Sequence, residues 1–377
     1  FKAEPMMTGN IYVVKSSDGG ITWGAPVQAN INSQGMTDFP SIAVSDAGNP
    51  SVMFMCFDSV MTNPFYAVAS STDGGATYPV ATPVSTVGLT EVCDCCPGYM
   101  AIKGNYFVPA WRRNDSNTRD MWVGISNDAG ATYTIGLDVD NTNWMLSSCP
   151  SSGPSPYLTN DSIIVAFMSG ASSDNRIYLS SHSYPGYQTG ISTFVDNTVS
   201  SAAIQNYPFL AGSNDTVGLV YQESLTGNTE AMYSYSYTGA SGLVNNSFVL
   251  NNSTTGNQKN PHLAYASGTF HFVWVDYVSG NVMYKAGSVP TGITENANNP
   301  ALSVYPNPSR ESMRIDLSLL NGEKGMLEVF DVNGKLVESA NVSGMKNYLL
   351  EKQIPGVYMV KLSAKNGFQQ IAKVIFY

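Results

Sequence analysis

Short apolar runs bounded by turn-forming residues recur along most of the chain. Residues 51–57 (SVMFMCF), 162–168 (SIIVAFM) and 269–275 (TFHFVWV) are rich in β-branched, aromatic and methionine side chains, and turn-forming residues flank each run. Runs of this length between turn signals are typical of buried strands. The pattern therefore predicts an all-β chain.

The apolar runs come in pairs that repeat. Each pair begins with a proline-containing strand, followed by a turn and a second strand, and the five prolines are Pro40, Pro97, Pro156, Pro208 and Pro261. Repeats of about 50–60 residues that hold several strands are typical of β-propeller blades. Residues 9–28 have the pattern of the outer two strands of one more blade, whose inner strands would precede residue 1. We expect a six-bladed β-propeller with an incomplete first blade, or alternatively a five-bladed one whose N-terminal strands close the last blade.

A second repeat has the form Ser-x-Asp-x-Gly-x-Thr-aromatic. It occurs at residues 16–23, 71–78 and 126–133, and its aspartates are Asp18, Asp73 and Asp128. The pattern suits a tight hairpin turn, because the carboxylate accepts backbone N–H bonds and glycine adopts a positive φ. It resembles the Asp-box of the sialidase-type β-propellers, and the resemblance implies that the aromatic residue packs under the turn.

The end of the chain differs in charge from the rest. Residues 302–377 hold 9 Lys and Arg against 7 Asp and Glu, whereas the preceding residues hold 9 against 21. Residues 289–301 are rich in Pro, Asn and Gly and are typical of a linker. We therefore expect a propeller in residues 1–288 and a second domain in residues 302–377. Alternating strands with Asn-Gly pairs at 333–334 and 366–367 predict that this domain is an Ig-like antiparallel β-sandwich.

The second domain also carries two recognisable segments, Tyr305-Pro306-Asn307-Pro308 and Pro355-Gly356-Val357-Tyr358. With them, residues 303–377 resemble the C-terminal sorting domain of the type IX secretion system of Bacteroidetes. The resemblance implies the secretion machinery as a partner and export across the outer membrane. It also implies removal of the domain and a secreted or cell-surface location.

The overall composition excludes some function classes. The net charge of −10 argues against sequence-independent binding to nucleic acid or to an anionic membrane. No apolar run approaches the ~18 residues of a membrane span. The chain starts at Phe1 without a charged and apolar leader, so we expect a processed or trimmed chain.

Three of the five cysteines lie in EVCDCCPGYM, residues 91–100. Export into an oxidising compartment favours disulfides over thiolate-bound metal. The candidates are Cys93, Cys95, Cys96 and Cys149: we expect one of the first three to bridge to Cys149 in the next blade, and the other two to pair locally. Cys56, in an apolar strand, is expected to be a free buried thiol. A Cu or Zn site is the alternative, although no pair of histidines accompanies the cluster.

The propeller geometry places polar residues on the rim where second strands end. They are Asp58, Arg112, Arg113, Asp115, Gln222, Glu223, Asp276 and Tyr277, with Asp38, Arg119 and Asp120 nearby. Carboxylates, arginines and tyrosine on one rim suit recognition of a polar ligand such as a sugar. No cofactor is expected, although the loop at residues 114–120 is a further candidate for Ca²⁺.

The sialidase resemblance implies roles for these residues. Glu223, Tyr277 and Asp58 are the catalytic candidates, with Tyr221 and Asp38 as alternatives, and the expected chemistry is glycoside hydrolysis with a Tyr–Glu nucleophile and an Asp acid/base. The ligand-binding candidates are Asp38, Arg112, Arg113, Arg119 and Asp276. Whether the protein is an enzyme stays open at this point: the alternative is a non-catalytic surface protein that adheres, binds a glycan or a cell-surface ligand, or builds a layer.

Overall fold

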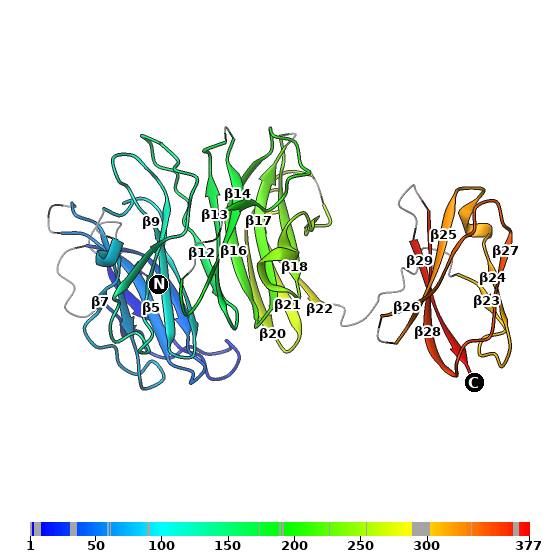
Figure 1. Cartoon of the computed structure of the whole chain (residues 1–377). Helices are drawn as coiled ribbons and strands as arrows, with labels where there is room; N and C mark the ends of the chain where they lie inside the picture. Colours follow the sequence, from blue (N-terminus) through cyan, green and yellow to red (C-terminus); the bar gives the residue numbers. More distant parts are fainter. Residues whose placement is uncertain are drawn as a thin grey trace. The chain divides into compact units, whose positions relative to one another are not determined.

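The computed structural model describes residues 2–377 except 4–8, 31–35, 59, 61, 89–90, 173, 188–189, 191, 226, 254, 289–301, 333 and 365–368. The chain forms two compact units, Phe1–Val289 and Pro290–Tyr377 (Figure 1). The expected linker, 289–301, lies outside the described residues, as does the second Asn-Gly pair at 366–367. All regular elements of the described residues are β-strands or short 3-10 helices.

Unit 1 consists, in the described residues, of six antiparallel sheets that follow one another along the chain. We number them sheets 1 to 6. Sheet 1 holds β1 (Lys2–Ala3), β2 (Asn10–Val13) and β3 (Val27–Gln28); sheet 2 holds β4 (Thr37–Val44), β5 (Pro50–Cys56), β6 (Phe65–Ser70) and β7 (Thr82–Pro83). Sheet 3 holds β8 (Tyr99–Lys103), β9 (Tyr106–Arg112), β10 (Met121–Ile125) and β11 (Ile135–Asp138). Sheet 4 holds β12 (Ser155–Leu158), β13 (Ser162–Ser169), β14 (Arg176–Ser183) and β15 (Thr193–Phe194). Sheet 5 holds β16 (Ile204–Ser213), β17 (Thr216–Ser224), β18 (Thr229–Ser236) and β19 (Ser247–Val249); sheet 6 holds β20 (Gln258–Ala266), β21 (Thr269–Asp276) and β22 (Asn281–Ser288). The 3-10 helices η1 (Ser85–Gly88) and η2 (Gly239–Leu243) lie in connections.

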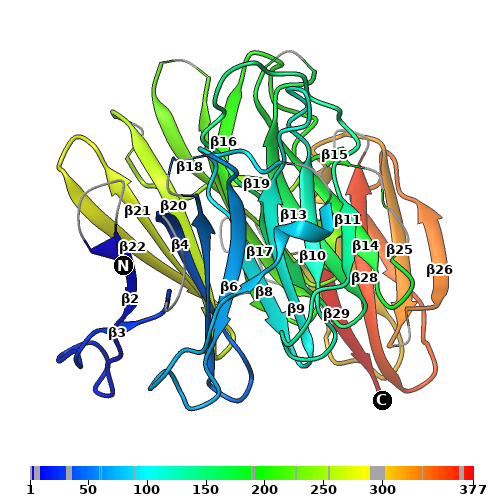
Figure 2. The same cartoon turned by 90° about the vertical axis from the view of Figure 1, so that its left-hand side faces the viewer.

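Consecutive sheets pack face to face (Figures 1 and 2). Strand β13 shows why its sequence is apolar at nearly every position. Ile163, Val165 and Phe167 pack with sheet 3, whereas the alternate residues Ile164 and Ala166 pack with sheet 5. A strand covered on both faces loses the usual apolar and polar alternation. Successive meander sheets with a hydrophobic layer between neighbours form a propeller-type fold.

The connections alternate between two rims because each sheet is an antiparallel meander. Turns between first and second strands, and between third and fourth strands, lie on what we call the Asp-turn rim. Loops that lead into a first strand, or join the second strand to the third, lie on the site rim. Two of the Ser-x-Asp-x-Gly repeats follow the third strand of their sheet, β6 or β10, and therefore lie on the Asp-turn rim. The repeat after β2 lies on the same rim, because Lys15 Nζ beside it donates to the carbonyl oxygen of Gly74 in the second repeat at 3.2 Å.

The repeats fold into one turn three times. In residues 71–77, the Ser71 hydroxyl accepts the Gly75 N–H at 2.8 Å, and Asp73 accepts the Thr77 N–H at 2.9 Å and its hydroxyl at 2.6 Å. The same bonds recur in residues 16–22 and 126–132. Gly75 has φ 88°, a left-handed conformation that glycine adopts without strain.

The aromatic residue at the end of the repeat is buried in two of the three turns and exposed in the other. Tyr78 and Tyr133 are buried between sheets, whereas Trp23 is 62% exposed. Trp23 lies in the connection between β2 and β3 of sheet 1, which within the described residues packs against another sheet on one face only. The predicted packing under the turn therefore occurs in two of the three repeats.

Unit 2 contains two antiparallel sheets. One holds β23 (Val304–Tyr305), β24 (Met313–Asp316) and β27 (Asn347–Leu350); the other holds β26 (Leu336–Asn341), β25 (Gly325–Asp331), β28 (Gly356–Ala364) and β29 (Gln369–Phe376), and η3 (Ser318–Leu320) follows β24. Met313 and Ile315 of the first sheet share a core with Leu327, Val329 and Val360 of the second. Unit 2 thus has a hydrophobic core of its own.

Candidate functional site on the site rim

A cavity of about 200 Å³ opens on the site rim where four first strands begin. We call it the rim pocket. Its walls come from β8, β12, β16 and β20 or the residues just before them: Pro97, Tyr99, Ser152, Tyr207, Phe209, Asn260 and His262. Because the first strands of a propeller surround its axis, this pocket lies at the convergence of four sheets.

Backbone bulges shape the rim at three equivalent positions. Phe39, Tyr207 and Asn260 each precede a proline, have φ of 49°, 54° and 52°, and sit where the pairing of the first strand shifts register. A positive φ is costly for a non-glycine residue, and bulges re-aim side chains. The Asn206 carboxamide stabilises one bulge by accepting the Tyr207 N–H at 2.8 Å, and Asp38 does the same for Phe39.

The bulge residues bring aromatic groups to the pocket. The Tyr99 and Phe209 rings meet edge to face with centroids 5.7 Å apart, and Phe209 lies 4.3 Å from the His262 ring. Tyr207 stays 39% exposed at the same place. Such a wall offers apolar ring faces with polar tips, which suits a ligand with both C–H and hydroxyl groups.

Glu223 lies half-buried near the end of β17, on the site rim but outside the lining of the rim pocket. Its Oε2 accepts a hydrogen bond from Gln205 Nε2 at 2.8 Å. The side-chain oxygen Oε1 of Gln205 in turn accepts a hydrogen bond from Arg176 Nε at 3.3 Å. The neighbouring Gln222 accepts the N–H of Asn260, a pocket residue, at 3.3 Å. Burial raises the pKa of Glu223, and the charge of Asp196 adds to the rise. A carboxyl group with a raised pKa can hold a proton for transfer.

The other predicted catalytic residues have different surroundings. Asp58 accepts four hydrogen bonds within its own turn, from the backbone of Val60 and from Thr62 and Asn63. The Thr62 hydroxyl and N–H are the main cause that lowers the pKa of Asp58 to about 2. Tyr277 is 57% exposed, and the Lys259 ammonium group lies 5.4 Å from its ring centre.

Asp276 is also engaged in a turn. It accepts the Val278 N–H at 2.8 Å, and this bond lowers its pKa. Asp38 accepts the N–H of its own neighbour Phe39 in the bulge. These carboxylates shape the backbone of the rim, and both stay predicted ligand-binding residues.

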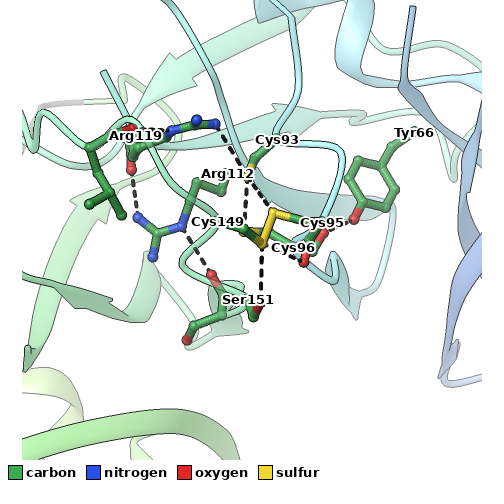
Figure 3. The surroundings of a disulfide bond; sticks show 10 residues. Tyr66, Cys93, Cys95, Cys96, Arg112, Arg119, Cys149 and Ser151 are labelled. Atoms are coloured by element: carbon green, nitrogen blue, oxygen red, sulfur yellow. Dashed lines mark hydrogen bonds between the residues drawn. A yellow bond between two sulfur atoms is a disulfide. The ribbon is translucent and has the colours of Figure 1, made fainter. Parts of the chain in front are cut away.

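Arg112 is fully buried and holds loops together. Its guanidinium donates to the carbonyl oxygen of Arg119 at 2.6 Å (Figure 3). It also donates to the carbonyl oxygens of Ser152 and Met168 at 3.0 and 2.6 Å. It also lies over the Trp144 ring at 5.3 Å. All three of its nitrogens are therefore used within the protein, so the arginine expected to bind a ligand organises the site rim instead.

Arg113 and Arg119 are engaged in the same region. Arg113 lies 3.3 Å from Asp120 and 4.0 Å from Asp115, and its guanidinium stacks over Trp122. Arg119 donates to the Leu146 carbonyl at 2.9 Å. The calcium candidate at residues 114–120 thus has both of its carboxylates turned toward an arginine, which opposes cation binding there.

The cysteine cluster contains one disulfide, Cys95–Cys149, which joins the loops leading into β8 and β12 (Figure 3). The predicted bridge between neighbouring sheets is therefore present, and Cys56 is free and buried as expected. Cys93 and Cys96, which were expected to pair locally, are free thiols in this structure and fully buried, with their sulfurs 3.0 Å apart. The hydrogen bond between them lowers the pKa of the Cys93 thiol to about 7 and raises that of Cys96.

A metal would have to use these sulfurs. Those of Cys93, Cys95 and Cys96 lie within 4.8 Å of one another. The disulfide engages Cys95, which leaves two thiols for a soft metal, and Arg119 Nη1 lies 3.5 Å from the Cys93 sulfur. Two thiols beside a guanidinium suit oxidation better than capture of a cation.

A second and larger cavity, of about 650 Å³, opens on the Asp-turn rim between sheets 4 and 5. We call it the hydroxyl pocket. Thr159, Ser162 and Thr238 line it together with Asp215 and Tyr237, and the described part of its lining contains no Lys or Arg. It lies on the rim opposite the predicted site and must be separated from the rim pocket in any binding experiment.

Several residues of the rim pocket were missed at the sequence level. Tyr99, Tyr207, Phe209 and His262 each lie within two residues of a repeated proline. The proline repeat predicts the start of a strand, and in the structure it also marks the bulges at Tyr207 and Asn260 that line the pocket. Gln205 carried no signal, because its role depends on pairing with Glu223 across β16 and β17.

Comparison with known proteins identifies one part of the chain. Residues 303–377 match the secretion system C-terminal sorting domain family. No curated protein matches the chain in sequence.

Similar solved structures include an α-L-arabinanase from Penicillium chrysogenum complexed with arabinobiose, at 10% identity and TM-score 0.46, covering 98% of this chain and 99% of that one. An α-L-arabinofuranosidase from Fusarium graminearum aligns at 11% identity and TM-score 0.47, covering 90% and 92%. A protein of unknown function from Dyadobacter fermentans aligns at 10% identity and TM-score 0.46, covering 93% and 96%. With every TM-score below 0.5, no residue role or substrate is transferred from these structures.

Export follows from the sorting domain. The described residues contain no helix that is long and apolar enough to cross a bilayer. Residues 303–377 match the secretion sorting domain, which directs the protein out of the cell, to the surface or the medium.

Proposed function

We propose that unit 1 is a six-bladed propeller that binds and hydrolyses a glycan at the rim pocket, and that unit 2 is an Ig-like sandwich that directs its export. The observation that carries the proposal is Glu223, a half-buried carboxyl group with a raised pKa on the same rim as a pocket with an aromatic wall. Glycoside hydrolysis needs a carboxyl group that is protonated near neutral pH and lies next to the leaving oxygen.

Glu223 fits the role of proton donor better than Asp58 does. Gln205 holds one oxygen of Glu223, while burial favours its protonated form. Asp58 is held ionised by its four hydrogen bonds, so we assign it to its turn. Tyr277 remains the proposed nucleophile, since its ring is exposed on the site rim next to Lys259.

The arginines argue for a neutral glycan. Recognition of a sialic acid carboxylate requires guanidinium groups with free N–H donors. Arg112 and Arg119 donate to backbone carbonyls, and Arg113 faces aspartates. We therefore propose an uncharged terminal sugar in place of a sialoside as the substrate, with Asn260 and Tyr207 at the pocket as its polar contacts.

The test is hydrolysis of a panel of fluorogenic glycosides, including a sialoside, by the full chain and two matched variants. Glu223→Gln keeps an acceptor for Gln205 but removes the acid, and we expect kcat to fall by roughly 10²-fold or more. Glu230→Gln changes the glutamate directly opposite on β18 and should leave kcat within about threefold. Equal activity of wild type and Glu223→Gln would refute the assignment of Glu223.

A binding protein without turnover is the second candidate. It is favoured by the engagement of Asp58 and Asp276 in hydrogen bonds of their own turns, which leaves Glu223 without an established second carboxyl group. If no glycoside is hydrolysed, a glycan array decides. Tyr207→Ala should then abolish binding at the rim pocket, whereas Tyr237→Ala in the hydroxyl pocket should not.

A further inference from the structure

Cys93 and Cys96 are not part of the Cys95–Cys149 disulfide, and their two thiols lie close enough together to react with each other. Both thiols are 0% exposed, and their sulfurs are 3.0 Å apart. Cys96 donates its N–H to the Cys93 carbonyl at 3.3 Å, so a tight turn holds the two residues together. The Tyr66 hydroxyl donates to the Cys96 carbonyl and fixes the turn from sheet 2 (Figure 3).

The sulfur of Cys93 also lies close to the existing disulfide. It is 3.5 Å from the Cys95 sulfur, only slightly farther than from that of Cys96. Cys149, the other half of the disulfide, is exposed. The cluster thus runs from an exposed sulfur through Cys95 and Cys93 to the buried Cys96 (Figure 3).

We propose that Cys93 and Cys96 form a second, buried disulfide, and that oxidising equivalents reach them through the exposed Cys95–Cys149 disulfide. An external oxidant cannot contact sulfurs with no exposed surface, whereas the internal disulfide is already within reach. The exported location supplies the oxidising surroundings in which disulfides persist.

The exchange balances in three steps. The Cys93 thiolate attacks the Cys95 sulfur, the Cys93–Cys95 bond forms, and Cys149 leaves as a thiolate that takes up a proton. The Cys96 thiolate then attacks Cys93, which forms Cys93–Cys96 and releases Cys95. Finally, an extracellular disulfide compound reoxidises Cys95 and Cys149, accepts two electrons and leaves as two thiols. Arg119 Nη1, 3.5 Å from the Cys93 sulfur, favours the thiolate that starts the sequence.

The first experiment counts thiols in the natively folded full chain. Denaturing alkylation with a maleimide without a reductant, followed by intact mass measurement, should add one label per chain, at Cys56. Three labels, at Cys56, Cys93 and Cys96, would overturn the second disulfide. Bound copper or zinc in the native mass, with Cys93 and Cys96 labelled after chelation, would overturn it in favour of a metal site.

The second experiment tests the route. The folded chain is reduced with dithiothreitol, reoxidised with oxidised glutathione, and sampled by acid quench and peptide mapping. In Cys149→Ser the Cys93–Cys96 bond should form at least tenfold more slowly than in the wild type. Cys56→Ser, which removes a buried thiol outside the cluster, should reoxidise at the wild-type rate. Equal rates of Cys93–Cys96 formation in Cys149→Ser and in the wild type would overturn the route. If a variant fails to fold, the thiol count of the wild-type chain still tests the second disulfide.

Discussion

At the scale of single residues, a buried carboxyl group outside the rim pocket gives a testable prediction about the pH dependence of stability. Asp140, which follows β11, is 3% exposed. Thr142 donates its N–H to Oδ1 at 2.8 Å, while Oδ2 has no hydrogen-bond partner among the described residues. Burial raises the pKa of Asp140 to about 7, and the charge of Asp120 adds to the rise while Arg112 opposes it.

This carboxyl group should make the protein less stable as the pH rises. Between about pH 4 and 7 the folded state keeps the proton that the unfolded state has lost. The free energy of unfolding therefore falls across this window and levels off above it. Asp140→Asn should remove that fall, and its stability relative to wild type should be higher at pH 8 than at pH 4.5 by about 1–4 kcal/mol.

Urea denaturation at several pH values measures the effect of Asp140→Asn. Asp215→Asn, at an exposed position, serves as the control and should follow the wild-type pH profile. A wild-type profile in Asp140→Asn as well would show that this carboxyl group is not the source of the pH dependence.

Arg112 and Arg113 show what could and could not be predicted for single residues. Both lie where β9 ends, so the sequence placed them correctly on the site rim. Neighbours on a strand point to opposite faces, and only packing decides which face is the interior. Arg112 packs against the Trp144 ring and donates a hydrogen bond to the Met168 carbonyl of sheet 4. The sequence of sheet 3 alone does not predict these contacts.

At the scale of elements, the close approach of two loops supports the site rim. The loops leading into β8 and β12 are joined by Cys95–Cys149 and by a contact between Gly153 and Pro97. A Cβ added at Gly153 would lie 1.8 Å from the Pro97 carbonyl oxygen. Since that atom belongs to the backbone, the two loops would have to separate.

Gly153→Ala should therefore lower the free energy of unfolding by about 1–3 kcal/mol, the usual cost of overpacking. Gly287→Ala is the matched control, because an added Cβ there meets nothing within 4 Å. Thermal denaturation of both variants gives the comparison. Equal unfolding temperatures would mean that the loops separate at no cost.

The elements themselves were largely predictable, and the exceptions have physical causes. The five pairs of first and second strands lie where the proline repeat placed them, from β4–β5 to β20–β21. The Asp turns also formed as expected, since their bonds are local. The bulges at Phe39, Tyr207 and Asn260 were not predicted, because they require a register shift against a partner strand.

At the scale of the whole molecule, the export signal lies in unit 2, whereas the rim pocket and the cysteine cluster lie in unit 1. Unit 2 has a core to which both of its sheets contribute, and its residues 303–377 match the sorting domain family. A folded module with its own core can be read by the secretion machinery irrespective of what precedes it. The rim pocket and the cysteine cluster belong to unit 1, so export and the proposed glycan hydrolysis should be separable by mutation.

Deletion of residues 303–377 should therefore abolish appearance of unit 1 at the cell surface and in the medium, whereas Glu223→Gln in the full chain should be exported like the wild type. Cell fractionation and protease accessibility on intact cells measure both. A reporter protein fused to residues 290–377 should gain export, because the signal lies within unit 2. Surface display of the truncated chain would contradict this division, and loss of export in Glu223→Gln would show that the machinery also depends on unit 1.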